Sequence, residues 1–234
     1  MIRAAQNGDL RELTRLLENN ANIEERSEGG YSPLHLAAEN GHEGAVRLLL
    51  ENNANIAARD NEGFSPLHYA AENGHEGVVR LLLENNANTA AMDNYGYSPL
   101  HWAASSGHEG VVRLLLENNA DIAASTNDGA SPLHLAAVHG HEGVVRLLLE
   151  NNADIAASTN DGYSPLHLAA VYGHEGAVRL LVEKNADIAA MDNDGSTALD
   201  EALRYGHGAV ATLLRQAAAT ASPPQQAPVG QVGL

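Results

Sequence analysis

Apolar residues recur along this chain in short clusters, two to a group, and polar turns separate the groups. In one such group, Leu67, Ala70 and Ala71 fall on a single stripe of a short helix. A broader cluster rich in Val and Leu follows between residues 76 and 85 and predicts a second helix. The chain is therefore expected to fold into pairs of short helices.

The ends of these helices carry residues with known capping preferences. Residues 60–63 have Asp first and Gly fourth, as a type I turn prefers. Ser65 then stands at the N-cap of the first helix, and Pro66 at its first position, where no N–H donor is needed. Gly74 is expected to end this helix, and Asn86 the second one, each in the left-handed conformation.

The same order of motifs returns every 33 residues. Ser-Pro-Leu-His and Gly-His-Glu-Gly each occur five times at this spacing, and the units that begin at Thr126 and Thr159 differ at only six of 33 positions. Two helices of about nine residues cannot bury such wide apolar surfaces alone, and helices that short are marginal in water. Stacking of neighbouring units solves both problems and predicts an elongated, curved solenoid.

These units resemble the ankyrin repeat. The resemblance rests on Ser-Pro-Leu-His-x-Ala-Ala, where that family has Thr-Pro-Leu-His, and on Gly-His-Glu-Gly, Val-Val-Arg-Leu-Leu-Leu and Asn-Ala-Asp-Ile; it covers roughly residues 2–215. It implies an all-α ankyrin repeat solenoid, whose helix-turn-helix units are joined by β-turn or hairpin-like loops. It also implies a non-enzymatic scaffold for protein–protein interaction that holds a protein or peptide in its concave groove.

Domain boundaries follow from the repeat frame. A single ankyrin repeat domain is expected over residues 1–216, with atypical, more polar units as caps at 1–26 and 192–216. Five internal repeats are expected between them, over residues 27–59, 60–92, 93–125, 126–158 and 159–191. Residues 217–234 form an uncharged Ala-, Pro- and Gln-rich tail, whose composition predicts a disordered or polyproline-like segment.

Two questions stay open at this point. The tail is either a stand-in ligand in the groove of its own or a neighbouring copy, or a coil without such a role. Near-identical repeats and the absence of cysteine favour an engineered, consensus-like scaffold. The tail and the uneven chemistry of the groove favour instead a natural adaptor with recently duplicated repeats.

The chain is strongly acidic, with 30 Asp and Glu against 13 Lys and Arg and a formal net charge of −17. This charge repels phosphate backbones and anionic lipid, so neither nucleic acid nor a membrane is an expected partner. It favours a basic or extended protein segment, although it also keeps a long solenoid soluble. Glu76, Arg80 and Glu84 lie four residues apart on one helix and are expected to form a ladder of ion pairs. Without cysteine, a signal peptide or a long apolar run, we expect a soluble, cytoplasmic protein.

Twelve histidines raise the alternative of a metal site or a catalytic centre. Ten of them recur at two positions of the unit, inside Ser-Pro-Leu-His and Gly-His-Glu-Gly, which favours structural roles. His139 and His141 are expected to hold Zn²⁺ or Ni²⁺ only adventitiously. No His-Glu-x-x-His, phosphate-binding glycine loop or nucleophile with a neighbouring base occurs. No enzyme, resident metal or cofactor is therefore expected.

Residues that differ between the otherwise similar units are free to recognise a partner. They cluster at the second, third, fifth, thirteenth, fourteenth and last positions of the unit, with a further change at the tenth. In ankyrin repeats these places form the turn tips and the exposed face of the first helix. The predicted partner-binding residues are Tyr31, Glu39, Asn40, Glu62, Phe64, Tyr69, Glu72, Asn73, Tyr95, Tyr97, Trp102, Ser105, Ser106, Asp128, Val138, His139, Asp161, Tyr163, Val171 and Tyr172.

The predicted groove changes character along its length. It is expected to be aromatic in its middle, acidic towards the N-terminal half and more apolar over residues 138–172. Tyr and Trp are enriched at interface hot spots. Tyr69 and Trp102 have packing between repeats as an alternative role. The rings expected on exposed finger-like turns are Tyr31, Phe64, Tyr95 and Tyr97.

Overall fold

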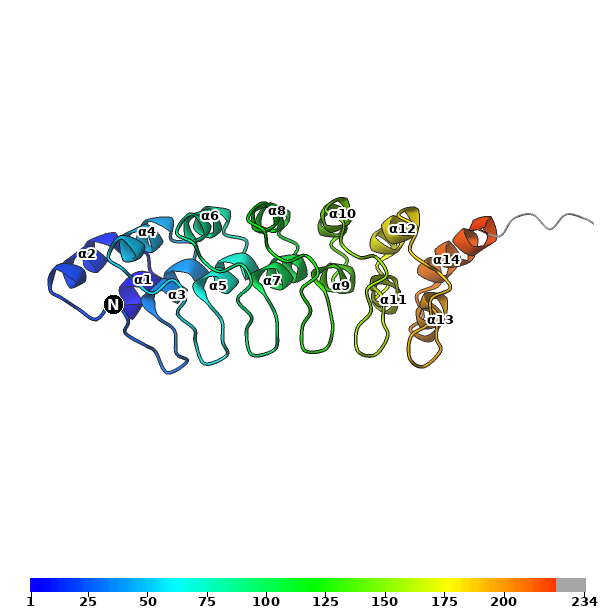
Figure 1. The fold of residues 1–234 in the computed structure, drawn as a ribbon, viewed down its shortest axis with the longest axis horizontal. Helices are drawn as coiled ribbons and strands as arrows, with labels where there is room; N and C mark the ends of the chain where they lie inside the picture. The colour runs from blue at the N-terminus through cyan, green and yellow to red at the C-terminus, as the bar shows by residue number, and fades with distance from the viewer. Residues whose placement is uncertain (222–234) are drawn as a thin grey trace, which may run out of the picture.

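In the computed structural model, which describes residues 1–221, the chain forms an elongated row of helix pairs (Figure 1). The first helix of each pair lies beside the turns, and the second helices form a parallel row behind it. The described residues contain no strand, only an isolated antiparallel bridge between Met191 and Thr197. The predicted all-α repeat solenoid is confirmed. The first helices are α1 (Ile2–Gln6), α3 (Pro33–Glu39), α5 (Pro66–Glu72), α7 (Pro99–Ser106), α9 (Pro132–Val138), α11 (Pro165–Val171) and α13 (Ala198–Arg204), and the second helices are α2 (Leu10–Glu18), α4 (Glu43–Glu51), α6 (Glu76–Glu84), α8 (Glu109–Glu117), α10 (Glu142–Glu150), α12 (Glu175–Glu183) and α14 (Gly208–Ala221).

Each internal first helix begins with the same hydrogen-bonded box. In α5, the backbone N–H and the hydroxyl of Ser65 donate to Nδ1 of His68, at 3.0 and 2.8 Å. Nε2 of His68 donates to the carbonyl oxygen of Tyr97 in the next unit, at 3.1 Å. Because a carbonyl only accepts, Nε2 carries the proton, and the imidazole is neutral. These histidines therefore cap their own helix and bond the next unit at the same time.

The last unit closes the box with a carboxylate instead. Thr197 donates its backbone N–H and its hydroxyl to Oδ2 of Asp200, at 2.9 and 2.6 Å. No further described turn follows α13 to offer a carbonyl, so a histidine here would leave its second donor without that acceptor. Asp200 only accepts, which suits the end of the row.

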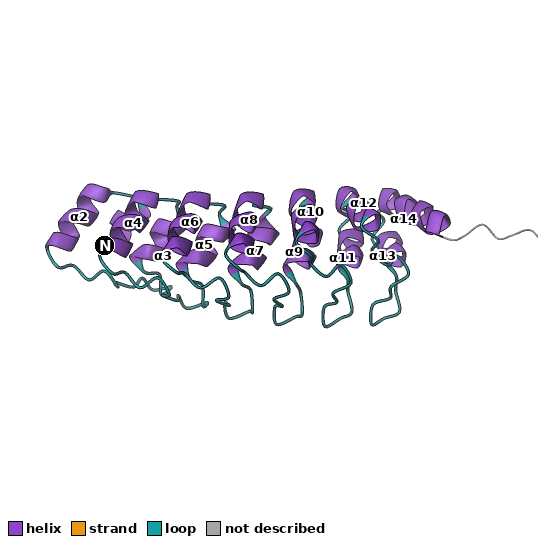
Figure 2. Ribbon diagram, turned by 45° about the horizontal axis from the view of Figure 1, so that its top comes forward, coloured by secondary structure: helices purple, strands orange, loops and turns teal. Residues whose placement is uncertain are grey.

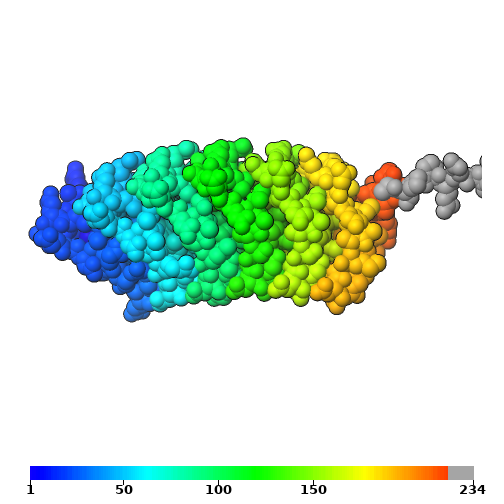
Figure 3. All heavy atoms as spheres, viewed as in Figure 1, coloured from blue at the N-terminus to red at the C-terminus, as the bar shows by residue number. Residues whose placement is uncertain are grey.

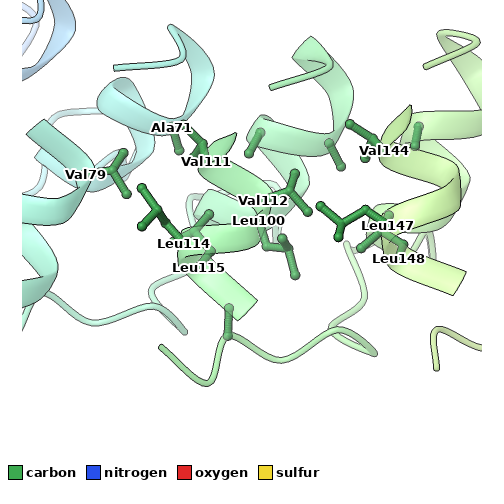
Figure 4. Packing of buried hydrophobic residues seen from close by; sticks show 14 of the residues in the cluster. Ala71, Val79, Leu100, Val111, Val112, Leu114, Leu115, Val144, Leu147 and Leu148 are labelled. Atoms are coloured by element: carbon green, nitrogen blue, oxygen red, sulfur yellow. The ribbon is translucent and has the colours of Figure 1, made fainter. Parts of the chain in front are cut away.

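The second helices supply most of the buried Val and Leu side chains. Leu82 of α6 and Leu115 of α8 are inaccessible to solvent, as are the equivalent leucines of α4, α10 and α12. Figure 4 shows Leu114 of α8 on the side that faces Val79 of α6, so one unit fills the space beside the next. Small residues such as Ala71 let the two rows of helices approach closely. One apolar cluster thus runs from the first unit to the last, which stabilises helices too short to stand alone.

Gly-His-Glu-Gly locks neighbouring units together. Gly74 ends α5 with a φ of +74°, and Asn86 follows α6 with a φ of +65°, as predicted. A Cβ at Gly74 would lie only 2.6 Å from Nδ1 of His108 in the next unit, so glycine alone lets that ring approach. Nε2 of His108 then donates to the carbonyl oxygen of Glu72, at 3.0 Å.

The predicted ladder of Glu76, Arg80 and Glu84 is wrong. The ion pairs among residues 1–221 are Met1–Glu25, Glu12–Arg15 and Glu201–Arg204. The Glu76 carboxylate lies instead against Gly110, in the first turn of α8. The positive end of that helix dipole attracts a carboxylate, which explains why Glu76 turns to the neighbouring unit.

The last helix runs further than the repeat frame suggested. The other second helices have nine residues, whereas α14 has 14 and ends at Ala221. Residues 217–221 are therefore helical, not disordered or polyproline-like, because Ala has the highest helix propensity. The predictions for residues 222–234, including the tail as a groove ligand, lie outside the described residues. Among the described helices, none is long and apolar enough to cross a membrane.

Candidate functional site

Successive turns form a row of fingers that project to one side of the array (Figures 1 and 2). Each finger is held in shape by its first residue. In the finger of residues 93–97, Oδ1 of Asp93 accepts the backbone N–H groups of Tyr95 and Tyr97, at 2.9 Å each. A rigid finger presents its tip in a defined place, which favours its use in binding.

Side-chain amides join each finger to the preceding one. Asn94 donates Nδ2 to the carbonyl oxygen of Asn61 at 3.1 Å, and its backbone N–H to that of Glu62 at 2.9 Å. We call this the asparagine ladder. The fingers thus form one hydrogen-bonded ribbon, not a set of independent loops. The ladder comprises Asn61, Asn94, Asn127, Asn160 and Asn193.

The finger tips and the adjoining faces of the first helices form one continuous side of the molecule, here called the finger surface (Figure 3). At the tips, the third residue is exposed in the units that begin at residues 60, 93, 126, 159 and 192, and Tyr95 has 57% of its surface accessible. The other exposed tip residues among the predicted set are acidic. These are Glu62, Asp128 and Asp161.

Five aromatic side chains from three consecutive units pack together as an aromatic run. The ring centroids of Tyr31 and Tyr69 lie 5.6 Å apart, and those of Tyr69 and Phe64 lie 5.0 Å apart. Trp102 continues the run, at 5.2 Å from Phe64 and 5.2 Å from Tyr97. These separations are typical of favourable aromatic pairs.

The expectation that Phe64 stands on an exposed finger is wrong. Its ring is only 6% exposed, because Tyr69 of its own unit and Trp102 of the next lie against it. Tyr31 and Tyr97 are half-buried, and Tyr95 is exposed. The aromatic run therefore presents some ring edges to solvent and keeps others inside.

The tenth residues of two units pack between repeats and also hold the fingers. The Tyr69 hydroxyl donates to Oδ2 of Asp60 at 2.6 Å, and Nε1 of Trp102 donates to Oδ2 of Asp93 at 3.0 Å. Tyr69 is buried and Trp102 is half-buried. Burial, followed by the hydrogen bond to Asp60, raises the pKa of the Tyr69 hydroxyl, so it stays a donor.

The N-terminal half of the finger surface is acidic. Glu39 and Glu72 are half-buried at equivalent places on α3 and α5. Burial, and then the charge of Glu39, raise the pKa of the Glu72 carboxyl. Asn40 and Asn73 are exposed, but each uses Nδ2 to cap its own helix, on a carbonyl at 2.8 and 2.9 Å respectively.

Further along, the surface is less charged. Ser105 and Ser106 of α7 are half-buried, as are Val138, Val171 and Tyr163. Burial, followed by the charge of Asp128, raises the pKa of Tyr97 at the start of this stretch. The remaining predicted residues of this region, His139 and Tyr172, are exposed.

His139 lies near other imidazoles. Its ring centroid is 6.0 Å from that of His141. Burial, and then the charges of His141 and His174, lower the pKa of His139. Within residues 1–221, no group of three or more His, Asp or Glu side chains is arranged to hold a metal ion.

Sequence reasoning missed several residues of this surface. Asp60 was assigned only to a turn and Asp93 was not singled out, although they anchor Tyr69 and Trp102. Tyr205 is 56% exposed at the fourteenth place of the last unit. The 33-residue frame placed Tyr205 in line with Tyr172, a signal that was passed over because the last unit was treated only as a cap.

The stacked helix pairs and the ribbon of fingers define a repeat solenoid that presents a long, shaped surface. The family model for ankyrin repeats matches in three copies, over residues 1–93, 88–159 and 156–223. The crystal structure of the human ASB11 ankyrin repeat domain is similar, with a TM-score of 0.86 and 28% identity over 95% of this chain and 98% of that one. No curated protein gave a significant match. This chain belongs to the ankyrin repeat family and is a protein–protein interaction scaffold.

Proposed function

We propose that this scaffold binds a basic, extended segment of a partner protein along the finger surface, without catalysis. The observation that carries the proposal is the aromatic run lying beside carboxylates that have no basic partner. Glu39, Glu62 and Glu72 take part in none of the ion pairs among the described residues. The chain's formal net charge of −17 has to be balanced from outside, by solvent ions or by a partner.

A cationic side chain suits this surface for two reasons. It relieves the repulsion between Glu39 and Glu72 that contributes to the raised pKa of Glu72. It also gains from contact with the faces of Tyr or Trp rings, which attract Arg and Lys. A segment in extended conformation suits the geometry, because the fingers follow one another in a single row along the molecule (Figure 2). The less charged stretch from Val138 to Tyr172 suits apolar side chains of the same segment.

The test is a titration with an extended peptide that carries Arg at every third residue. We expect Tyr97→Ala to weaken binding about tenfold, as loss of an aromatic interface residue commonly does. Arg113→Ala is the matched control, since Arg113 is exposed on α8 away from the fingers, and it should bind like the wild type. Raised salt should weaken the interaction.

The proposal fails if both variants lose binding equally or if neither does. It also fails in its charge component if a peptide with Glu in place of Arg binds as tightly. An unbiased screen against cell extract at two salt concentrations then identifies the natural class of partner.

The near identity of the units supports a consensus-like, engineered origin over recent duplication of a natural adaptor. The coding sequence separates the two. Synonymous codon differences that accumulate between the copies indicate a natural duplication, whereas codons chosen without regard to ancestry indicate design.

A further inference from the structure

The residue at the first place of each unit determines whether the tenth residue has to donate a hydrogen bond to it. Thr126 and Thr159 each accept one backbone N–H through Oγ1, at 3.1 and 3.2 Å, and need no further donor. The tenth residue of both units is leucine, Leu135 and Leu168. A hydroxyl first residue is therefore paired with an apolar tenth residue.

An aspartate in first place has a second oxygen to satisfy. Oδ1 of Asp60 accepts two backbone N–H groups of its finger, at 3.0 and 2.8 Å, and Oδ2 is left over. The tenth residue then supplies a donor: the hydroxyl of Tyr69 for Asp60, and Nε1–H of Trp102 for Asp93. Burial makes this donor necessary, because an unpaired carboxylate oxygen inside a protein is unfavourable.

The last unit has the aspartate but a carboxyl group in the donor's place. Oδ1 of Asp192 accepts the N–H groups of Asp194 and Ser196, at 2.9 and 2.8 Å. The tenth residue is Glu201, which is fully buried in α13. Oδ2 of Asp192 and both carboxyl oxygens of Glu201 are buried without a hydrogen-bond partner.

Arg204 does not satisfy these oxygens. Its Nη1 lies 2.8 Å from Oε1 of Glu201, at ion-pair distance but without hydrogen-bond alignment, and its Nη2 donates to Oγ of Ser196 at 3.0 Å. The Arg204 side chain is 52% exposed, so water weakens its attraction. Asp192 itself takes part in none of the ion pairs among the described residues, so the half-exposed guanidinium beside Glu201 leaves this second buried carboxyl group without a basic partner.

The other groups around the pair add no positive charge. Tyr163 of the preceding unit lies near both carboxyl groups, and burial, followed by the acidic character of this site, raises its pKa. The other basic residues of the adjoining helices are already hydrogen-bonded or lie exposed to solvent. His167 of α11 donates Nε2–H to the Ser196 carbonyl and accepts at Nδ1 from Ser164, and Arg215 of α14 is exposed.

We propose that Glu201 carries a proton in the folded protein and donates it to Oδ2 of Asp192, as Tyr69 and Trp102 donate to their aspartates. A protonated carboxyl is the one form of glutamate that has a donor. A glutamate in the unfolded chain is ionised at neutral pH, so the folded last unit binds one more proton than the unfolded one. The contribution of this proton to the stability of the last unit is therefore greatest in mild acid and declines as the pH rises. The hydrogen bond from Glu201 to Asp192 thus holds the last finger only while Glu201 is protonated.

The first experiment reads the proton directly. In the full chain, the ¹³C shift of the Glu201 carboxyl carbon is followed by NMR from pH 5 to pH 8, with the signal assigned by its loss in Glu201→Gln. We expect the protonated shift to persist at pH 6, well above the pH at which a glutamate in an unfolded chain ionises. A carboxylate shift for Glu201 across the whole range overturns the proposal.

The second experiment uses variants that restore a pairing seen elsewhere in the chain. Glu201→Gln has a permanent donor, and Asp192→Thr with Glu201→Leu installs the Thr–Leu pair of the two preceding units. Amide exchange in α13 reports opening of the last unit. The ratio of the wild-type to the Glu201→Gln opening constant should rise with pH, by at most about tenfold per pH unit, as one proton requires.

The opening constant of the double variant should depend on pH as that of Glu201→Gln does. The opening constant of the exposed control Glu183→Gln should depend on pH as that of the wild type does. The opposite result is equally clear. If Glu201→Gln opens faster than the wild type by the same factor at every pH, Glu201 is an ionised partner of Arg204 and the proposal is wrong.

Discussion

At the residue scale, two glycines share a backbone conformation but not their surroundings. Gly74 and Gly206 both end a first helix, with φ of +74° and +79°. A Cβ at Gly74 meets the ring of His108, whereas a Cβ at Gly206 has nothing within 4 Å. The pair therefore separates the effect of backbone strain from that of contact with the next unit.

We expect Gly206→Ala to lower the free energy of unfolding by about 1 kcal/mol, because a Cβ disfavours the left-handed conformation. Gly74→Ala should lower it by about 1–3 kcal/mol more, because the methyl group displaces the His108 ring. Urea unfolding followed by circular dichroism measures both. Equal losses for the two variants contradict the proposed locking of Gly74 onto His108.

Phe64 shows what a residue-by-residue interpretation leaves out. Its place in the unit is the one occupied by the half-buried Tyr31 and Tyr163, and nothing in its own sequence marks it as buried. Burial follows from its neighbours, because Tyr69 and Trp102 are both large enough to cover the ring. The capping residues, by contrast, were predicted correctly, since a cap depends on backbone groups within a few residues.

At the scale of elements, the fingers depend on one another through the asparagine ladder. The Nδ2 of Asn94 bonds the preceding finger, and the following finger bonds Asn94 through Nδ2 of Asn127. A substitution in one finger should therefore be felt in the next. Asn118 offers a matched control, because its Nδ2 bonds the carbonyl of Leu114 within its own helix end, at 2.8 Å.

Asn94→Ala and Asn118→Ala should each cost roughly 1 kcal/mol, the usual contribution of such a hydrogen bond. Only Asn94→Ala should raise amide exchange at Asn127, whose N–H donates to the carbonyl of Tyr95 in the altered finger. Exchange measured residue by residue by NMR distinguishes the two. Unchanged exchange at Asn127 would mean that the fingers move independently.

The elements themselves were well predicted, and the errors have local causes. Helix 76–84 was expected between residues 76 and 85, because apolar periodicity and capping agree there. The Glu76 ladder failed because the next helix dipole offers a better partner than Arg80, and that neighbour exists only in the stacked structure. The extension of α14 was missed because the Ala-rich segment was judged by its Pro-rich continuation.

At the scale of the whole molecule, buried neutral histidines make the array sensitive to acid. Burial lowers the pKa of His68 and of His101 to about 4, and it lowers those of His35 and His134 as well. Folded values below the unfolded value of about 6.5 mean that the unfolded chain takes up protons first. The corresponding stability is present above that pH and is lost as the pH falls towards 4.

We therefore expect the urea midpoint to fall between pH 7 and pH 4, with a loss of up to about 3 kcal/mol for a histidine whose pKa is lowered from 6.5 to about 4. His68→Ala should be less stable at pH 7 but lose less on acidification. Urea titrations at several pH values measure both slopes. An identical slope in the variant would show that His68 does not contribute to acid sensitivity.

Much of the candidate surface was within reach of the sequence, because the repeat frame places variable residues on one side of the array. The 33-residue repeat frame gives the place of each residue in its unit, but not how deeply its side chain is buried. It put Glu39, Glu62 and Glu72 on the finger surface together with aromatic residues, while their exposure depends on contacts between units. The Asp192–Glu201 pair was not predicted for a related reason. The missing donor at Glu201 becomes apparent only when the pair is compared with the hydrogen-bonded pairs of the other units.

The bonds between units have one further consequence. The side-chain bonds that recur between units span fixed intervals of 29, 33 or 36 residues, so the internal units offer their neighbours the same donors and acceptors at these places. Misaligned recombination between two copies of the coding sequence adds or removes 33 residues and leaves every such bond with an equivalent partner. The array can therefore gain or lose one whole unit in a single genetic event. Lineages or libraries that carry such a sequence can lengthen or shorten the recognition surface without a new interface between units.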